Sequence, residues 1–344
     1  MKKGEMRMQI IWQDETKEKM TVNEKNGVTF LTYPKLSKIP WAVHGFSTRL
    51  GGVSKGMYAS MNLSFARGDE EADVRENYRR LSEAMGFSME DLVTSDQTHT
   101  TNVRIVGEAD RGNGITKPRP YQDVDGMITD VPGLVLSTFY ADCVPLYFVD
   151  TVHRAVGLSH SGWRGTVGKI GAVTVQKMRE AYGTRPEDIL AAVGPSICQA
   201  CYEVSEDVAE EFQKSFAREQ WDSLFYRKDN GKFQLNLWEA NRLIFLEAGI
   251  LPEHISMPNL CTCCNPEFLF SHRASKGKRG NLGAFLGNKR GMLFLQHPLM
   301  CYFLFTFFMS PMILALLERT FSTETSWLMM SMMLARYLLM FAST

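Results

Sequence analysis

Three residues that lie far apart along the chain carry side chains suited to a transition metal. His99, Cys143 and His160 supply two imidazoles and one thiolate, which are good ligands for zinc. Three protein ligands leave a fourth coordination position open for water or substrate. The spacing lacks the i, i+4 pattern of a helical zinc motif, but Cys143 and His160 close consecutive strand-like runs. We therefore expect one open metal site, holding zinc, with copper as the alternative.

Acidic residues accompany two of these candidate ligands. Asp142 directly precedes Cys143, where it could orient a neighbouring imidazole or serve as a general acid. The alternative is a carboxylate that only caps a turn. Asp123, Asp125 and Asp130 lie in a turn-rich stretch without EF-hand spacing, so we interpret them as loop residues with a possible supporting role near the metal.

Two stretches have features of an anion site. After a strand-like run ending at Ser159, the residues HSGWRGT lead into a helical pattern that continues to about Tyr182. Free backbone N–H groups at a helix start favour an anion, and an arginine there can clamp it. We expect phosphate contacts from Arg49, which adjoins a Gly-rich loop without P-loop spacing, and from the helix start at Arg164, Gly165 and Thr166. The alternative for HSGWRGT is an ordinary strand-turn-helix connection.

A second set of cysteines competes for a metal. Cys198-x-x-Cys201, together with Cys261 and either Cys263 or Cys264, could form a closed structural zinc site. The separation between the pairs is far longer than in a zinc ribbon, and the Cys261-x-Cys263 pair is too tight. The alternative is that these cysteines are ordinary small buried residues.

The elements that must position these residues alternate irregularly between strand and helix. The apolar pattern predicts strands near 27–33, 134–140, 145–149, 154–159 and 189–193, and a strand, turn and strand over 92–106; residues 41–49 form a further apolar run. It predicts helices over 69–85, 205–216 and 236–248. No internal repeat is present. We expect a polar lead-in over 1–26 and one mixed α/β (α+β) domain on a mixed β-sheet over 27–287.

Bulk composition excludes some partners. Lys plus Arg and Asp plus Glu both number 38, so the chain lacks the basic excess of a general nucleic-acid binder. No apolar h-region follows Lys2 and Lys3, and the Cys count of seven is odd. These features predict a cytoplasmic protein with reduced thiols, which we expect to be monomeric.

The segment 288–344 differs from the rest of the chain. It is apolar and Met-rich, and the run 292–317 contains no Asp, Glu, Lys or Arg. That run is long enough to span a bilayer, and the basic residues before it would keep the domain on the cytoplasmic side. The alternative is an extension that never evolved with the domain, such as a shifted reading frame.

Several motifs in order resemble the laccase-domain (polyphenol oxidoreductase-like) family, over roughly Val28 to Gly287. They are HGFSTRLGGVS, SDQTHT, DGMITD, YADCVPL, HSGWRGT, GPSI followed by YEV, and FLFSHR with KRGNLGAFLG. The resemblance implies an α/β-type single domain that binds zinc through His99, Cys143 and His160. It also implies phosphorolysis of purine nucleosides (adenosine, inosine and methylthioadenosine), with adenosine deamination; bacterial members are linked to editing of peptidoglycan precursors. Two departures are Ala274, which alters the usual basic pair after FSHR, and the segment from Asn288, which the family does not cover.

Two rival functions remain open at this level. The first is a copper-dependent polyphenol oxidase, which would need about ten His ligands for its copper centres, whereas the chain has seven His. The second is a membrane-anchored ligand-binding protein, in which the apolar run inserts into a bilayer.

Overall fold

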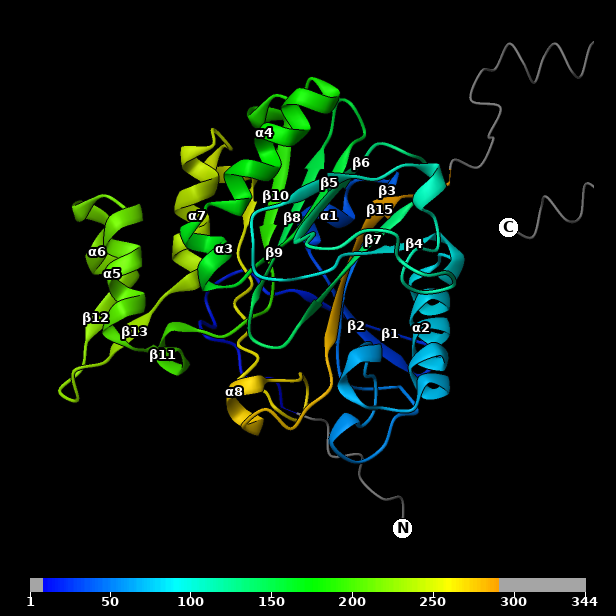
Figure 1. The fold of residues 1–344 in the computed structure, drawn as a ribbon, viewed down its shortest axis with the longest axis horizontal. Coiled ribbons are helices and arrows are strands. Elements are labelled where there is room, and N and C mark those ends of the chain that lie inside the picture. The colour runs from blue at the N-terminus through cyan, green and yellow to red at the C-terminus, as the bar shows by residue number, and fades with distance from the viewer. Residues whose placement is uncertain (1–8, 291–344) are drawn as a thin grey trace, which may run out of the picture. The chain divides into compact units, whose positions relative to one another are not determined.

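The computed structural model describes residues 9–290 (Figure 1). Their strands form two six-stranded sheets and a small three-stranded sheet. The first sheet has the order β1-β2-β3-β15-β7-β4, with bounds Thr21–Lys25, Val28–Thr32, Ala42–Ser47, Leu282–Asn288, Val135–Tyr140 and Leu92–Thr94. The second has the order β14-β10-β8-β9-β6-β5, with bounds Ile255–Ser256, Ile189–Val193, Val144–Asp150, Val156–Ser161, Gly126–Thr129 and Val103–Ile105. The third has the order β11-β13-β12, with bounds Glu203–Val204, Phe233–Leu235 and Phe225–Arg227.

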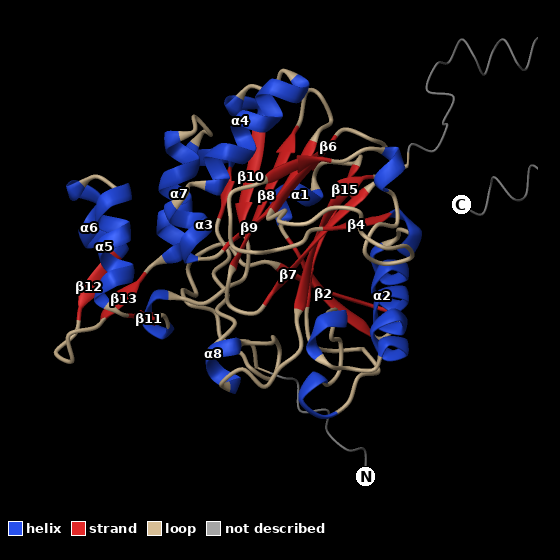
Figure 2. Cartoon of the chain, in the orientation of Figure 1, coloured by secondary structure: helices blue, strands red, loops and turns tan. Residues whose placement is uncertain are grey.

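Helices cover the outer faces of the two large sheets (Figure 2). The helices of the described residues are α1 Pro34–Ser37, α2 Glu71–Met85, α3 Trp163–Val167, α4 Ile170–Tyr182, α5 Glu206–Ser215, α6 Trp221–Leu224, α7 Leu237–Glu247 and α8 His272–Ser275, and of these α2, α4 and α7 cover the large sheets. Helix α2 packs on the first sheet, whereas α4 and α7 pack on the second. Residues 9–290 are therefore layered as helix, sheet, sheet and helix.

Strand β8 shows why its sequence is apolar without alternation. Tyr147 and Val149 face the core between the two sheets, and Leu146 and Phe148 face the core beneath α4 and α7. Successive side chains of a strand point to opposite faces, so a strand buried on both faces reads as a continuous apolar run. The same reason explains the run that forms β7, and it confirms the mixed α/β class expected from the sequence.

Three expectations need correction. The strands are divided between two large mixed sheets, and not gathered in one. The stretch Gly126–Thr129, expected to be a loop, is the buried strand β6, whose four residues are too few to show a period. Residues Thr21–Lys25, expected in a loose lead-in, form the edge strand β1.

The domain boundary at 287 and the tail 288–344 stay predictions, because residues 291–344 lie outside the described part. Within residues 9–290, no helix combines the length and the apolar character needed to cross a bilayer.

Candidate functional site

The structure brings the three metal-ligand candidates together. The ligand atoms of His99, Cys143 and His160, hereafter the His-Cys-His group, all lie within 4.8 Å of one another. The two imidazole rings are nearly perpendicular, with centroids 4.9 Å apart. Three donors at this separation can contact a single ion.

The two-sheet architecture explains this convergence. His99 lies in the connection from β4 to β5, and Cys143 lies in the tight turn from β7 to β8. Both connections carry the chain from the first sheet to the second, so they emerge at places where the sheets adjoin. His160 lies near the end of β9, which pairs with β8, and its register partner is Pro145. The group therefore lies where the β4–β5 and β7–β8 connections come close to the end of β9.

Asp125 holds two members of the group in place. Its Oδ1 accepts a hydrogen bond from His160 Nδ1 at 2.8 Å and from the His99 backbone N–H at 3.1 Å. Its Oδ2 accepts the backbone N–H groups of Thr98 and Thr100, each at 2.9 Å. Because Nδ1 of His160 donates to a carboxylate, Nε2 is left to face a metal, which is the usual arrangement of metal-ligating histidines. Asp125, expected only as a loop residue with a possible supporting role, is thus the orienting carboxylate.

The charges of the group reinforce one another. Burial alone would raise the pKa of the Cys143 thiol, but the neighbouring His160 and His99 lower it to about 6. Burial would lower the pKa of His160, yet Cys143 and Asp125 raise it to about 9. Burial likewise opposes ionisation of Asp125, and the His160 and Thr100 hydrogen bonds still bring its pKa to about 2. The metal-free chain therefore favours a thiolate beside an imidazolium, and a cation can take the place of the shared proton.

One side of the group is open, and one side is closed by a glycine. His99 is exposed, whereas His160 is buried. On the closed side, a Cβ added to Gly162 would lie 2.9 Å from His99 Cδ2 and 3.3 Å from Cys143 Sγ. Glycine at 162 therefore allows the ring and the sulfur to approach each other, and access for a small ligand remains from the side of His99.

Asp142 does not orient an imidazole, contrary to one of its expected roles. Its Oδ1 accepts a hydrogen bond from Thr262 Oγ1 at 2.7 Å, and its Oδ2 accepts the Arg273 backbone N–H at 2.7 Å. The residue has a left-handed backbone, with φ of 87°, in the turn before Cys143. Its carboxylate therefore ties this turn to two later segments, and Asp125 performs the orienting role.

The expected anion site at the helix start is also different in the structure. The long helix expected after Thr166 is broken at Lys169, whose φ is 56°, into α3 and α4. Thr166 lies inside α3, where its N–H and Oγ1 both donate to the Gly162 carbonyl, at 2.8 and 2.9 Å. Thr166 thus has no free donor for phosphate, and Gly165 is buried in the same turn.

The two expected arginines occupy unlike surroundings. The Arg49 guanidinium donates to the carbonyls of Ala59 at 2.9 Å and Pro266 at 2.6 Å, and it stacks 4.8 Å from the Phe270 ring centroid. Arg164 is exposed and stacks 4.2 Å from the Trp163 ring centroid. Arg164 is therefore the freer of the two to meet an anion.

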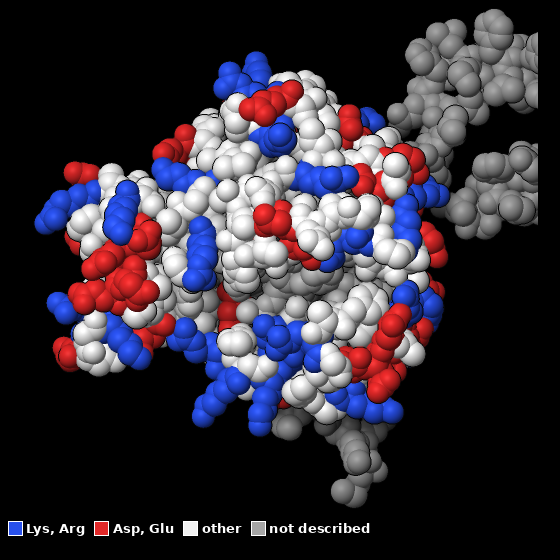
Figure 3. All heavy atoms as spheres, in the orientation of Figure 1, with Lys and Arg blue, Asp and Glu red and all other residues white. Residues whose placement is uncertain are grey.

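Cationic residues that the sequence interpretation missed gather around α8. Arg279, half-buried, has a pKa lowered to about 10 by burial and by Arg67, while Asp142 and Cys143 oppose the shift. His272 Nδ1 lies 3.5 Å from Arg279 Nη2. Figure 3 shows Lys and Arg side chains concentrated over this part of the molecule. We call Arg67, Arg279 and His272 the basic rim. His272 and Arg279 belong to the FLFSHR and KRG stretches, which resemble the family without an assigned role, whereas Arg67 lies outside the motifs.

A cavity of about 660 Å³ lies beside the group without including it. Its lining includes Gln97, two residues before His99, and Phe139, four residues before Cys143. Gln97 joins the β4–β5 connection to strand β7, since Nε2 donates to the Phe139 carbonyl at 2.8 Å and Oε1 accepts the Phe139 N–H at 2.6 Å.

Comparison with known proteins gives a consistent picture. The family model described as multi-copper polyphenol oxidoreductase laccase matches residues 43–289. The purine nucleoside phosphorylase YlmD of Geobacillus stearothermophilus is 39% identical over 250 residues, which cover 72% of this chain and 90% of that protein. The adenosine deaminase RL5, from an unknown prokaryotic organism, is 35% identical over 233 residues, covering 67% and 88% of the two chains. The crystal structure of the Geobacillus YlmD superposes with a TM-score of 0.73 at 37% identity, covering 78% of this chain and 98% of that one.

Proposed function

The chain belongs to the multi-copper polyphenol oxidoreductase laccase family, and from that premise we propose that it is a zinc-dependent purine nucleoside phosphorylase with adenosine deamination as a side activity. Its relatives' names support a nucleoside-processing enzyme. The observation that carries the proposal is the convergence of two imidazoles and one thiolate, with Asp125 fixing the tautomer of His160.

The donor set fits zinc better than a multicopper centre. A sulfur and two nitrogens within 4.8 Å of one another match the three-ligand, open zinc sites of hydrolytic and transfer enzymes. Multicopper oxidases need about ten histidines grouped around several ions. Within residues 9–290, only His99 and His160 share a group of potential metal ligands. A bound zinc ion would supply Lewis acidity at this position.

The residues of the chain supply substrate binding in this proposal. In phosphorolysis an oxygen of phosphate attacks C1′ of the ribose, the bond from C1′ to N9 of the purine breaks, and the base leaves with a proton. Arg279, with Arg67 beside it, lies near the turn that carries Asp142 and Cys143, and the two guanidinium charges suit a phosphate dianion. Burial and Arg279 lower the pKa of His272, so its neutral ring would contact the phosphate as a hydrogen-bonding group. In deamination water attacks C6 and ammonia leaves, so the cations around phosphate have no role in that reaction.

Asp142 acts as a positioning residue in this scheme. Both of its oxygens already accept hydrogen bonds, and its own backbone carbonyl accepts the Ile197 N–H at 3.0 Å. These contacts hold the turn that presents the Cys143 sulfur. A ligand that the fold already holds in place loses little conformational freedom when it binds an ion, so the binding is stronger.

The test is product analysis with the full-length protein and adenosine, with and without phosphate. We expect adenine and ribose 1-phosphate only when phosphate is present, and a smaller yield of inosine in both conditions. Cys143→Ala should remove all three products, whereas Cys263→Ala, the same change outside the group, should keep them. A Cys143→Ala protein that still splits adenosine at the wild-type rate would overturn the proposal. Phenol oxidation by copper-loaded protein, without nucleoside cleavage, would favour the oxidase.

A further inference from the structure

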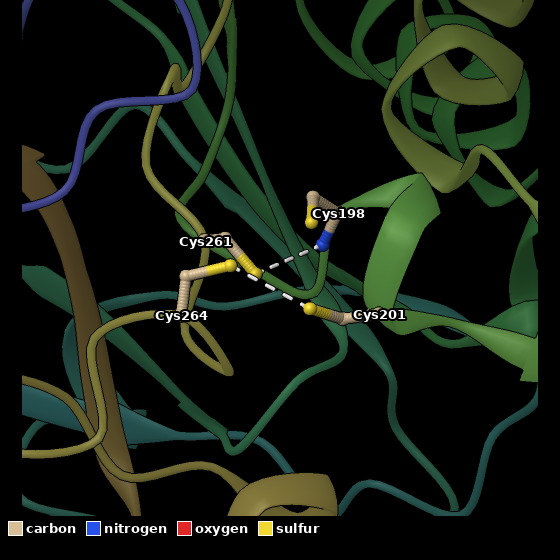
Figure 4. Close-up of side chains that lie close together, drawn as sticks. All are labelled: Cys198, Cys201, Cys261 and Cys264. Atoms are coloured by element: carbon tan, nitrogen blue, oxygen red, sulfur yellow. Dashed lines mark hydrogen bonds between the residues drawn. The ribbon is translucent and has the colours of Figure 1, made fainter.

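A second group of potential metal ligands lies apart from the His-Cys-His group. Its members are four thiols from two distant segments, which we call the four-cysteine cluster: Cys198, Cys201, Cys261 and Cys264. Their sulfurs all lie within 4.8 Å of one another, and those of Cys201 and Cys264 are 3.5 Å apart (Figure 4). We propose that this cluster binds one zinc ion as a closed site with four thiolate ligands.

The spacing within each pair supports this assignment. The structure selects Cys264, and not Cys263, as the partner of Cys261. Both halves are then Cys-x-x-Cys pairs, which is the ligand spacing of structural zinc sites. The objection that one pair is too tight therefore no longer applies.

The distances distinguish a mononuclear ion from the alternatives. A zinc–sulfur bond of about 2.3 Å in a tetrahedron places sulfurs about 3.8 Å apart. The observed separation of 3.5 Å and the upper limit of 4.8 Å bracket that value. A disulfide needs about 2.05 Å between its sulfurs. An iron–sulfur cluster needs room for several atoms between the four thiols, and this arrangement leaves room for one.

The surroundings are those of a closed site. Cys198 and Cys261 are buried, and Ile197, Tyr202 and Trp238 pack around the thiols. The Cys198 N–H donates to Cys261 Sγ at 3.2 Å, which stabilises a thiolate. Four thiolates around a divalent ion leave a net negative charge. The Arg273 guanidinium, which donates to the Cys201 carbonyl at 3.3 Å, supplies a neighbouring positive charge.

A bound ion would fasten two segments that both contact the turn before Cys143. The Thr262 N–H donates to the Ser196 carbonyl at 3.1 Å, so the segments already touch through their backbones. Thr262 and Ile197 each adjoin a cysteine of the cluster and each donate a hydrogen bond to Asp142. The closed site would therefore support the geometry of the open site without touching substrate.

Metal analysis of a variant that lacks the open site tests this inference independently of the proposed function. Full-length Cys143→Ala protein, purified under reducing conditions, should retain about one zinc ion per chain. Adding Cys201→Ala and Cys264→Ala, the two half-buried members, should remove that ion, whereas adding Cys263→Ala should not. Cobalt substituted into the Cys143→Ala protein should show the intense charge-transfer bands of four thiolate ligands.

The cobalt spectrum keeps the test decisive if the triple variant fails to fold. Cys143→Ala protein without zinc or cobalt binding would overturn the inference. Two disulfides among the four cysteines, found by mass spectrometry in protein purified under reducing conditions, would also overturn it, as would bound iron in place of zinc.

Discussion

The two groups of potential metal ligands differ in how many coordination positions they would leave free on an ion. The His-Cys-His group has three donors, one exposed member and an adjoining basic rim. The four-cysteine cluster has four donors, which would fill a tetrahedral ion, and apolar residues around it. An ion in the first would keep a position for substrate, whereas an ion in the second would have none. In the roles we propose, donor number and exposure separate a site for chemistry from a site for stability on the same chain.

The largest effects should come from removing ligands from one site and comparing the result with removal of ligands from the other. Cys143→Ala should lower kcat/KM by at least about a thousandfold, or about 4 kcal/mol, because it removes the Lewis acid. Its melting temperature should stay close to wild type. The Cys201→Ala and Cys264→Ala double variant should lose on the order of 10 °C in melting temperature, because it removes a cross-link between segments.

Calorimetry and steady-state kinetics on the same preparations check this pair. Equal losses of activity and stability in both variants would contradict the distinction between the two sites.

The next effect concerns the carboxylate that orients His160. Asp125→Asn should weaken zinc binding at the open site by about 10–100-fold. The neutral amide accepts the hydrogen bond from His160 Nδ1 less strongly than the carboxylate does, so the ring is held less firmly and is a weaker ligand. Asp123→Asn is the matched control. Asp123 bonds Thr100 Oγ1 at 3.0 Å and Asn102 Nδ2 at 2.6 Å and does not contact the imidazole. Competition with a chelator measures both affinities, and equal effects would show that Asp125 only shapes the loop.

Low pH should weaken metal binding at both sites, because protons compete with a metal ion for the same ligand atoms. His44 provides an acid response unrelated to either site. It is buried, its Nε2 accepts the Tyr33 N–H at 2.8 Å, and burial lowers its pKa to about 4. A folded-state pKa below the unfolded value of about 6.5 means that stability is present above pH 6.5 and declines as pH falls toward 4.

At pH 5.5 this linkage amounts to about 1.4 kcal/mol. Urea unfolding at pH 7.5 and 5.5 should show His44→Gln losing that much less stability than wild type. An identical pH dependence would show that His44 is not buried in its neutral form.

The smallest effect should come from the glycine that closes the open site. Gly162→Ala places a methyl group against the His99 ring and the Cys143 sulfur, and should weaken zinc binding roughly fivefold, or about 1 kcal/mol. Gly107→Ala is the control, because a Cβ there meets no atom within 4 Å. An unchanged affinity in Gly162→Ala would mean that the ring moves aside without cost.

Sequence patterns predicted the long elements better than the contacts between them. Strand β10 agrees with the expected range 189–193, and α7 lies within 236–248. Their patterns record burial, which is a local property. The partner of His160 was not predictable, because Asp125 precedes a four-residue strand without a visible period and reaches the ring only through the pairing of β6 with β9. The break at Lys169 was also missed, since a left-handed lysine has no local signal.

The two metal groups show the same limit. Residue type and family resemblance point to His99, Cys143 and His160, but the connections between the two sheets that bring them together have no signature in the sequence. The sequence does not distinguish Cys264 from Cys263, because only the path of the chain after Leu260 decides which sulfur turns toward Cys201.

The most direct measurement is anomalous diffraction at the zinc edge from crystals of the full-length protein. The account predicts one peak within bonding distance of His99, Cys143 Sγ and His160 Nε2, with the fourth position free of protein ligands. It predicts a second peak among the four sulfurs of the four-cysteine cluster. Zinc-replete crystals without a peak between the two imidazoles and the Cys143 thiolate would contradict the central claim.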